Sequence, residues 1–292
     1  MSSSKQRIVT GAILTTLASL GLLYMLRDDG REDDLPLDWT LEKLGMKSEL
    51  ELVQRACYAE ASNPDTDGPD LIAWVIRNRI DVPGYGDSAE EVVTFAGSQN
   101  GQPVYHFSSY AEGSTRRWVY DVPLSELEKQ PTWKEVSMLV EYVMNADRSM
   151  NPIPRCLNFV NPHLLGGKTK RRVNPGDTLR AYIDHYDGEI STSVAAIQVS
   201  NAIYDPSRDL RADSDIRIPG FSICSTHRTV LDTTKGPSWA VGLRVVPESD
   251  GLTHWFLEDA GVCQCLHDYE RAKAGDSGAM DWWQVERKAV LV

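Results

Sequence analysis

The first strong helical pattern in this chain begins at Ser48. Ser48 and Glu51 form an S-x-x-E capping box, which is a typical helix start, and the proline after Asn63 prevents the helix from continuing. Four side chains recur at helical spacing and share one stripe of this predicted helix: Leu50, Val53, Cys57 and Glu60. The pattern therefore places a carboxyl group at an apolar position near the C-terminal end of the helix.

The position of Glu60 permits two interpretations. On the apolar face, its carboxyl group is partly desolvated, which favours the protonated form that a general acid requires. Alternatively, the last turn frays and Glu60 points into solvent, because periodicity fixes the ends of helices poorly. The first interpretation makes Glu60 the candidate catalytic residue.

Three further helices carry start signals. One runs from Leu71 to Ile80 after a cap at Asp67 or Asp70, and it is apolar around most of its circumference. Two more capping boxes, at Ser88 and at Thr132, open the other two helices. The region from about residue 48 to residue 145 is therefore expected to be mainly helical.

The segments between and after these helices have other patterns. Residues 98–109 and 110–123 are expected to be long loops, which commonly carry substrate contacts. After Pro152, short alternating stretches such as Trp239 to Val246 and His254 to Leu257 lie between Gly, Pro and Asp residues. The C-terminal part of the chain is therefore expected to be rich in β-strands.

A long uncharged segment, from Ile8 to Leu26, precedes all of these elements. At a rise of about 1.5 Å per residue it is long enough to cross the hydrocarbon core of a bilayer. Lys5 and Arg7 precede it, and an acidic run follows it: Asp28, Asp29, Glu32, Asp33 and Asp34. This asymmetry predicts a single-pass membrane protein with a cytoplasmic N-terminus and a body that faces the periplasm or the cell wall. A cleavable signal peptide is the alternative, although the segment is long for one.

These patterns divide the chain into four parts. Residues 1–29 are a predicted membrane anchor, and residues 30–47 a charged tether with a short helix. Residues 48–190 are expected to form the mainly helical catalytic domain, and residues 191–292 a β-rich region of unknown role. The expected fold class is α+β.

Composition limits the partners of this protein. A chain of 292 residues, with 41% hydrophobic and 25% charged residues, is expected to fold into globular domains. Its formal net charge of -12 argues against nucleic acid as a partner, because a polyanion would repel it. The five cysteines are an odd number, so the chain does not have the pattern of a disulfide scaffold.

The order of motifs after Tyr58 carries a family resemblance. A predicted helix ends in Glu60, a short acidic loop that contains a glycine follows, and a buried helix closes in Asn78-Arg79. Four further motifs follow, at residues 82–85, 91–93, 107–108 and 158–162. In the order and spacing of these motifs, residues 50–162 resemble the cell wall hydrolase family that includes the spore cortex-lytic enzymes. It departs from the family pattern in the loop at residues 63–67 and at the aromatic pair, here Phe159-Val160.

The resemblance implies a lysozyme-like, α-rich fold and cleavage of peptidoglycan between N-acetylmuramic acid and N-acetylglucosamine. Many members of the family are lytic transglycosylases, in which one glutamate, here Glu60, acts as acid and then as base and yields a 1,6-anhydro sugar. The expected partners are then peptidoglycan glycan strands and, through residues 8–26, a lipid bilayer, and no cofactor is expected. A bacterium that remodels its wall, or a membrane-containing virus that must breach one, would have use for such a protein.

Two alternatives to a transglycosylase stay open. One is a muramidase with two carboxylates, whose second carboxylate would be Asp65, Asp67 or Asp70. These three residues are also ordinary turn and cap residues. The other alternative is a non-enzymatic, membrane-anchored scaffold or wall-binding protein that has kept the fold.

Six residues are candidates for substrate binding: Asn78, Phe107, Ser108, Tyr110, Phe159 and Asn161. Those around residue 108 are expected to form a lip that stacks on sugars and hydrogen-bonds to them, although Phe107 can also be a core residue. Asn78 lies on a predicted buried helix, where its amide either contacts Glu60 or the substrate, or satisfies loop backbone. Phe159 and Asn161 come from the aromatic Asn-Pro stretch of the resemblance.

One group of residues suggests a metal site. Cys263, Cys265 and His267 have the spacing of a strand, which would align three ligands on one face, and His254 would be a fourth ligand for a structural zinc. The alternative is that they are ordinary strand residues, because zinc sites more often use a C-x-x-C spacing. The second interpretation is preferred, so no metal is expected, and Cys263, Cys265 and His267 are kept only as a candidate site.

Overall fold

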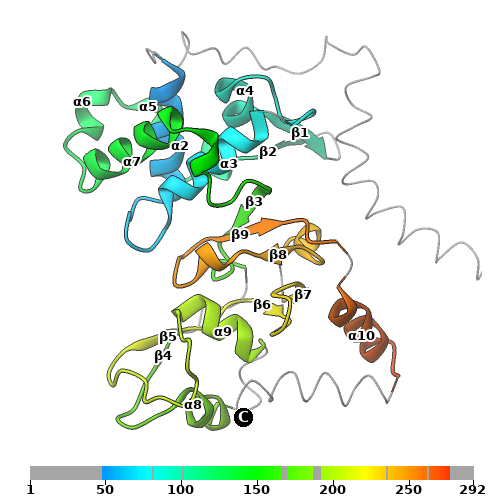
Figure 1. Cartoon of the computed structure of the whole chain (residues 1–292). Coiled ribbons are helices and arrows are strands. Elements are labelled where there is room, and N and C mark those ends of the chain that lie inside the picture. The colour runs from blue at the N-terminus through cyan, green and yellow to red at the C-terminus, as the bar shows by residue number, and fades with distance from the viewer. Residues whose placement is uncertain are drawn as a thin grey trace, which may run out of the picture. The chain divides into compact units, whose positions relative to one another are not determined.

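A computed structural model describes residues 48–80, 82–99, 102–165, 170–186, 192–234, 236–261 and 263–276 (Figure 1). The predicted anchor at residues 8–26 and the tether at residues 30–47 lie outside this part of the chain. Within the described residues, none of the helices combines the length and the apolar character needed to span a bilayer.

The chain forms two compact units. Within the described residues, the first unit contains residues 48–62 and those from Ile76 to Asn145, and the second contains Asn63–Val75 and residues 146–276. The predicted division between residues 190 and 191 does not coincide with this arrangement, because residues 146–190 belong to the second unit. Both helices and strands are present, which confirms the α+β class.

Helix α2 (Glu49–Glu60) begins as the capping box predicts. The hydroxyl of Ser48 accepts a hydrogen bond from the backbone N–H of Glu51 at 3.2 Å. The helix ends at Glu60, earlier than the predicted end at Asn63, because Ala61 leaves the helical conformation at φ -141° and ψ 84°. Glu60 is therefore the last helical residue.

Helix α2 is the central element of the first unit. It contacts the other helices α4 (Ala89–Thr94), α5 (Trp118–Asp121) and α7 (Trp133–Asn145) and the 3-10 turn η1 (Ser108–Tyr110). Four of its apolar side chains are fully buried: Leu52, Val53, Ala56 and Cys57. The short helix α6 (Leu124–Leu127) lies between α5 and α7 in the sequence.

A buried arginine ties α2 to the segment around α5. The guanidinium of Arg55 pairs with the carboxylate of Glu51 at 2.7 Å and donates to the carbonyl oxygens of Val119 at 2.6 Å and Val122 at 2.8 Å. Both members of the ion pair are almost fully buried. The bonds to the two carbonyl oxygens hold α2 against the α5 segment, whereas the ion pair lies within α2. Loss of one partner of a buried ion pair leaves an uncompensated charge.

Helix α3 (Pro69–Ile80) starts two residues before the predicted Leu71. Proline is favoured at the first position of a helix, which explains the earlier start. Asp67 is not at the helix start: its carboxylate accepts a hydrogen bond from the backbone N–H of Asn63 at 3.0 Å and closes the loop between α2 and α3. Asp70 lies in the first turn, where a carboxylate interacts favourably with the helix dipole.

The prediction of an uninterrupted loop over residues 98–109 was wrong. Strands β1 (Ala96–Gln99) and β2 (Gln102–Tyr105) form an antiparallel hairpin, and η1 follows. Residues 110–123 likewise contain helix α5. The predicted binding residues Phe107, Ser108 and Tyr110 therefore lie between two elements with regular backbone hydrogen bonds, the β1–β2 hairpin before them and helix α5 after them.

The second unit contains small sheets and short helices. A three-stranded antiparallel sheet has the order β3-β9-β8, and two two-stranded antiparallel sheets pair β4 with β5 and β6 with β7. The strands are β3 (Cys156–Val160), β4 (Lys170–Arg172), β5 (Asp215–Arg217), β6 (Phe221–Ile223), β7 (Val230–Thr233), β8 (Arg244–Val245) and β9 (Trp255–Glu258). The helices are α8 (Leu179–His185), α9 (Val194–Asn201) and α10 (Gln264–Lys273), with 3-10 turns η2 (Arg148–Met150), η3 (Ser238–Ala240) and η4 (Pro247–Ser249).

The predicted strands of this unit are confirmed in part. The stretch from His254 to Leu257 corresponds to β9, but only two residues of the stretch from Trp239 to Val246 are a strand. One apolar core of the unit is formed around Trp255 and Phe221, whose rings pack edge to face at 5.7 Å.

Candidate active site at the end of helix α2

Glu60 is half-buried at the C-terminal end of α2. Its carboxyl oxygen Oε1 accepts a hydrogen bond from the backbone N–H of Ser109, at 3.0 Å. Among the described residues, the second oxygen, Oε2, has no hydrogen-bond partner. One oxygen is thus fixed by the η1 turn, and the other is available to exchange a proton.

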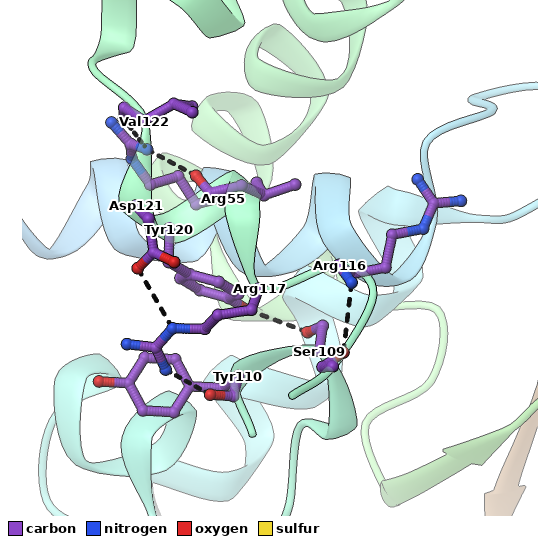
Figure 2. Close-up of polar contacts among 10 residues, drawn as sticks. Arg55, Ser109, Tyr110, Arg116, Arg117, Tyr120, Asp121 and Val122 are labelled. Atoms are coloured by element: carbon purple, nitrogen blue, oxygen red, sulfur yellow. Dashed lines mark hydrogen bonds and ion pairs between the residues drawn. The ribbon is translucent and has the colours of Figure 1, made fainter. Parts of the chain in front are cut away.

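The side chain of Ser109 continues this network into the core. Its hydroxyl hydrogen-bonds to the hydroxyl of Tyr120 at 3.1 Å, and both residues are buried (Figure 2). Burial raises the pKa of Tyr120 well above its ordinary value, and the negative charge of Glu60 adds to the rise. Tyr120 therefore stays neutral near pH 7 and acts as a hydrogen-bonding group.

Arg117 holds the η1 turn against helix α5 (Figure 2). Its guanidinium lies over the ring of Tyr110, 4.5 Å from the ring centroid, and donates to the carbonyl oxygen of the same residue. Its Nε also donates to the carboxylate of Asp121 at 3.3 Å. Tyr110 directly follows Ser109. These contacts therefore hold in place the backbone N–H of Ser109, which donates the hydrogen bond to Glu60.

A buried cation lies near Glu60. Burial lowers the pKa of Arg79 to about 10, and the charges of Tyr85 and Glu60 oppose this shift. The guanidinium packs over the rings of Tyr85 at 5.1 Å and Phe107 at 5.4 Å. Arg79 thus remains charged near pH 7 and supplies a positive potential around the carboxyl group of Glu60.

His106 is a neutral group in the same environment. Burial, together with the positive charge of Arg79, lowers its pKa to about 4. Its ring packs against Phe95 at 4.5 Å and Tyr85 at 5.2 Å. His106 is therefore uncharged near pH 7 and does not repel Arg79.

The structure corrects part of the predicted substrate-binding lip. Phe107 and Tyr110 are fully buried, so their rings stabilise the core beneath η1 and do not form a stacking surface for sugars. Ser108, by contrast, is exposed on η1, next to the residue that binds Glu60. Asn78 is on α3 and is 8% exposed, which agrees with the predicted buried amide.

Phe159 and Asn161 lie in the second unit. Phe159 is a half-buried residue of β3, and its ring contacts those of His254 at 5.7 Å and Phe256 at 6.0 Å. The side-chain oxygen of Asn161 accepts a hydrogen bond from the backbone N–H of His163 at 3.0 Å, which is a turn-forming contact. The structure thus gives both residues a local structural role.

The carboxylates considered for a second catalytic role also have local roles. Asp67 closes the loop after α2, and Asp70 lies in the first turn of α3. The backbone N–H of Asp65 donates to the side chain of Asn63 at 3.1 Å, and Asp65 itself is exposed. These contacts favour the interpretation of the three residues as turn and cap residues.

Sequence reasoning missed Ser109 and Tyr120. Ser109 contributes a backbone N–H, which every residue except proline carries, so its identity gave no signal. Tyr120 lies in a segment that was expected to be a loop, and its burial follows from helix α5.

The predicted metal ligands are arranged differently from the expectation. The prediction of a strand was wrong, since Cys265 and His267 are in helix α10 and Cys263 is the residue before it. The thiols of Cys263 and Cys265 lie together with Cys224 and His227, two residues with a C-x-x-H spacing that the sequence offered as a signal. Neither of the other predicted ligands belongs to this group: His267 is exposed and faces Asp268 at 3.7 Å, and His254 is buried beside Phe159.

Comparisons with known proteins add no relative. No family model, no curated protein and no solved structure matches this chain. The resemblance to cell wall hydrolases therefore rests on the motif residues between Leu50 and Pro162.

Proposed function

We propose that this protein cleaves the glycosidic bond between N-acetylmuramic acid and N-acetylglucosamine in peptidoglycan, as a lytic transglycosylase with a lysozyme-like catalytic fold. The observation that supports this most is the carboxyl group of Glu60, which is half-buried, bound at Oε1 by a backbone N–H and unbound at Oε2 among the described residues. A segment at residues 8–26 would anchor the enzyme in a membrane, with its body on the side of the cell wall.

The hydrogen bond from Ser109 suits both halves of such a reaction. When Oε2 carries a proton, Oε1 is a carbonyl oxygen that still accepts the N–H bond, and Glu60 can protonate the glycosidic oxygen as the bond breaks. After it has given up this proton, the carboxylate keeps the same bond and the same orientation. Oε2 can then take the proton of the C6 hydroxyl as that oxygen attacks the anomeric carbon, which yields the 1,6-anhydro sugar.

Neighbouring charges support the same assignment. The buried guanidinium of Arg79 stabilises the carboxylate that exists between the two proton transfers. A transglycosylase needs only one catalytic carboxyl group, because the substrate supplies the nucleophile. This agrees with the local structural roles of Asp65, Asp67 and Asp70 described above.

The test compares the purified full-length protein with a Glu60→Gln variant on isolated sacculi. Glutamine keeps the acceptor for Ser109 but cannot deliver a proton, so the rate of turbidity loss should fall by about 10²- to 10⁴-fold. Glu49→Gln is the matched control, because Glu49 is an exposed carboxylate on the same helix, and it should keep the parental rate.

The products distinguish the alternatives. Mass spectrometry of the released fragments should find anhydro ends, which are one water lighter than hydrolysed ends. Hydrolysed ends alone would favour a two-carboxylate muramidase. Binding to sacculi without any soluble fragment, or equal rates for the parent and Glu60→Gln, would refute the proposed role of Glu60.

A further inference from the structure

Four potential metal ligands meet in the second unit, apart from the residues of the proposed reaction. They are Cys224, His227, Cys263 and Cys265, and their ligand atoms all lie within 4.8 Å of one another. The other two cysteines of the chain, Cys57 and Cys156, are buried elsewhere and have no part in this group. Three of the five thiols thus converge on one imidazole.

The distances around this imidazole fit a tetrahedral metal. The Nδ1 atom of His227 is 3.6 Å from the sulfur of Cys224, 3.6 Å from that of Cys263 and 3.4 Å from that of Cys265. A tetrahedral zinc ion with zinc–sulfur bonds of about 2.3 Å and a zinc–nitrogen bond of about 2.0 Å places the nitrogen about 3.5 Å from each sulfur. We propose that these four residues bind one zinc ion through three thiolates and Nδ1 of His227.

The first pair of ligands is held by a tight turn after β6. The backbone N–H of His227 donates to the sulfur of Cys224 at 3.1 Å, an interaction that stabilises a thiolate. The N–H of Arg228 donates to the carbonyl oxygen of Cys224 at 2.9 Å, and Arg228 adopts a left-handed φ of 57°. The Arg228 side chain then pairs with Asp250, which fixes this turn to the segment beyond β8.

The second pair of ligands begins helix α10. Cys263 is its N-cap and Cys265 lies in its first turn, so the start of the helix holds both thiols in place. Outside the cluster, α10 is attached by the buried Tyr269, whose hydroxyl donates to Asp232 at 2.5 Å. A zinc ion would join the start of this helix to the β6–β7 turn, across some 40 residues of sequence.

The ligand set indicates a structural and not a catalytic zinc. Three sulfurs and one nitrogen complete a tetrahedron and leave no position for water or substrate. Sulfur-rich tetrahedral sites favour zinc over magnesium, calcium or manganese, which prefer oxygen ligands. The site therefore has a role in the stability of the second unit that is independent of the chemistry at Glu60.

The test measures the zinc content of the full-length protein after purification under reducing conditions and removal of loosely bound metal. The parent should contain about one zinc per chain. Cys224→Ser and His227→Ala should lose it, whereas His267→Ala should retain it, because His267 is exposed on α10 and lies outside the cluster. The assignment would be overturned if His267→Ala contained no zinc while His227→Ala still contained it. It would also be overturned if the parent, prepared in excess zinc, contained no zinc.

Two measurements on the parent do not depend on whether the variants fold. Replacement of zinc by cobalt should produce the absorption of a tetrahedral site and a thiolate charge-transfer band. Under denaturing conditions with a chelator and no reductant, all five thiols should react with an alkylating reagent. A disulfide among Cys224, Cys263 and Cys265, detected as two unreactive thiols, would overturn the zinc site.

Discussion

The Glu60 site and the Cys224 cluster hold their functional groups in opposite ways. Glu60 is fixed by one hydrogen bond at a helix end and keeps one oxygen free among the described residues, so that it can exchange protons with another molecule. In the cluster, the ligand atoms face one another, and a metal ion would use all of them. The site proposed for catalysis thus leaves a polar group incompletely satisfied, whereas the proposed metal site would satisfy every group it contains.

This difference predicts opposite effects of mutation. Changes in the cluster should cost stability in the second unit, whereas a change at Glu60 should cost activity and little stability. Because the two units are compact by themselves, regional probes such as hydrogen exchange can measure them separately.

The largest loss of stability is expected from removal of the zinc ion. A chelator that competes for zinc, or Cys224→Ser, should destabilise the second unit by on the order of 4 kcal/mol or more, since a metal that binds only the folded state contributes its binding energy to folding. Hydrogen exchange should show faster exchange in α10 and in the β6–β7 pair, with α2 unchanged. Equal loss of protection in α2 would contradict the separation of the two sites, and His267→Ala without chelator is the matched control for Cys224→Ser, because it keeps all four ligands.

The next largest effect is expected from Arg55→Leu. This change removes the guanidinium that pairs with the buried carboxylate of Glu51 and donates to two carbonyl oxygens, so the first unit should lose about 3–5 kcal/mol of stability. Hydrogen exchange of α2 in increasing denaturant measures the loss. Arg116→Leu is the control, because Arg116 is exposed in the same unit, and it should have little effect. A loss below about 1 kcal/mol in Arg55→Leu would show that this ion pair does not hold α2 in place.

Acid should distinguish the two units through His106. Its pKa is about 4 in the folded state and about 6.5 in an unfolded chain, so below pH 6.5 the unfolded state binds a proton that the folded state does not. The stability of the first unit should therefore fall between pH 6.5 and pH 4, by up to about 3 kcal/mol from this residue.

The variant His106→Phe isolates this contribution. Phenylalanine keeps a ring against Phe95 and Tyr85 but cannot be protonated, so the variant should lose less stability than the parent between pH 7 and pH 4.5. The second unit should be unaffected by this substitution, although acid weakens its zinc site through protonation of the thiolates. Identical pH profiles of α2 exchange in the parent and the variant would contradict the prediction.

The smallest change in stability is expected from Glu60→Gln. The amide oxygen can accept the same hydrogen bond from Ser109, so the free energy of unfolding should change by less than about 0.5 kcal/mol. Denaturant unfolding of the purified variant measures this. A loss greater than about 2 kcal/mol would indicate that Glu60 is chiefly a structural residue, and the contrast with the cluster would then disappear.

Local signals in the sequence predicted the elements that depend on local interactions. The start of α2 at Ser48, the start of α4 at Ser88 and the position of Glu60 at a helix end follow from capping residues and helical spacing. The β1–β2 hairpin had a signal too, since Asn100-Gly101 lies between its strands, but the polar residues around this pair obscured the alternation of a strand.

Features that depend on distant segments could not be predicted in the same way. The hydrogen bond from Ser109 to Glu60 joins residues that are 49 positions apart in the sequence. Its donor is a backbone N–H, which has no sequence signature. The cysteine cluster joins Cys265 to His227 across 38 positions, whereas proximity in the sequence and strand spacing indicate His267 and His254 as ligands. Cys263 and Cys265 were therefore predictable as ligands, whereas Cys224 and His227 were not, because only the folded chain brings them close to the other two.

The pairing of β3 with β9 has a consequence for the synthesis of this protein. β3 ends at Val160, whereas its partner β9 begins at Trp255, and the early segment at Thr66 also receives a hydrogen bond from the backbone of Thr253. During synthesis, β3 and the segment around Thr66 therefore have to wait for β9 and Thr253, which are translated only when most of the chain has been made. A chaperone that shields β3 during this interval should increase the yield of the full-length protein, and a message truncated before codon 255 should give an aggregating product.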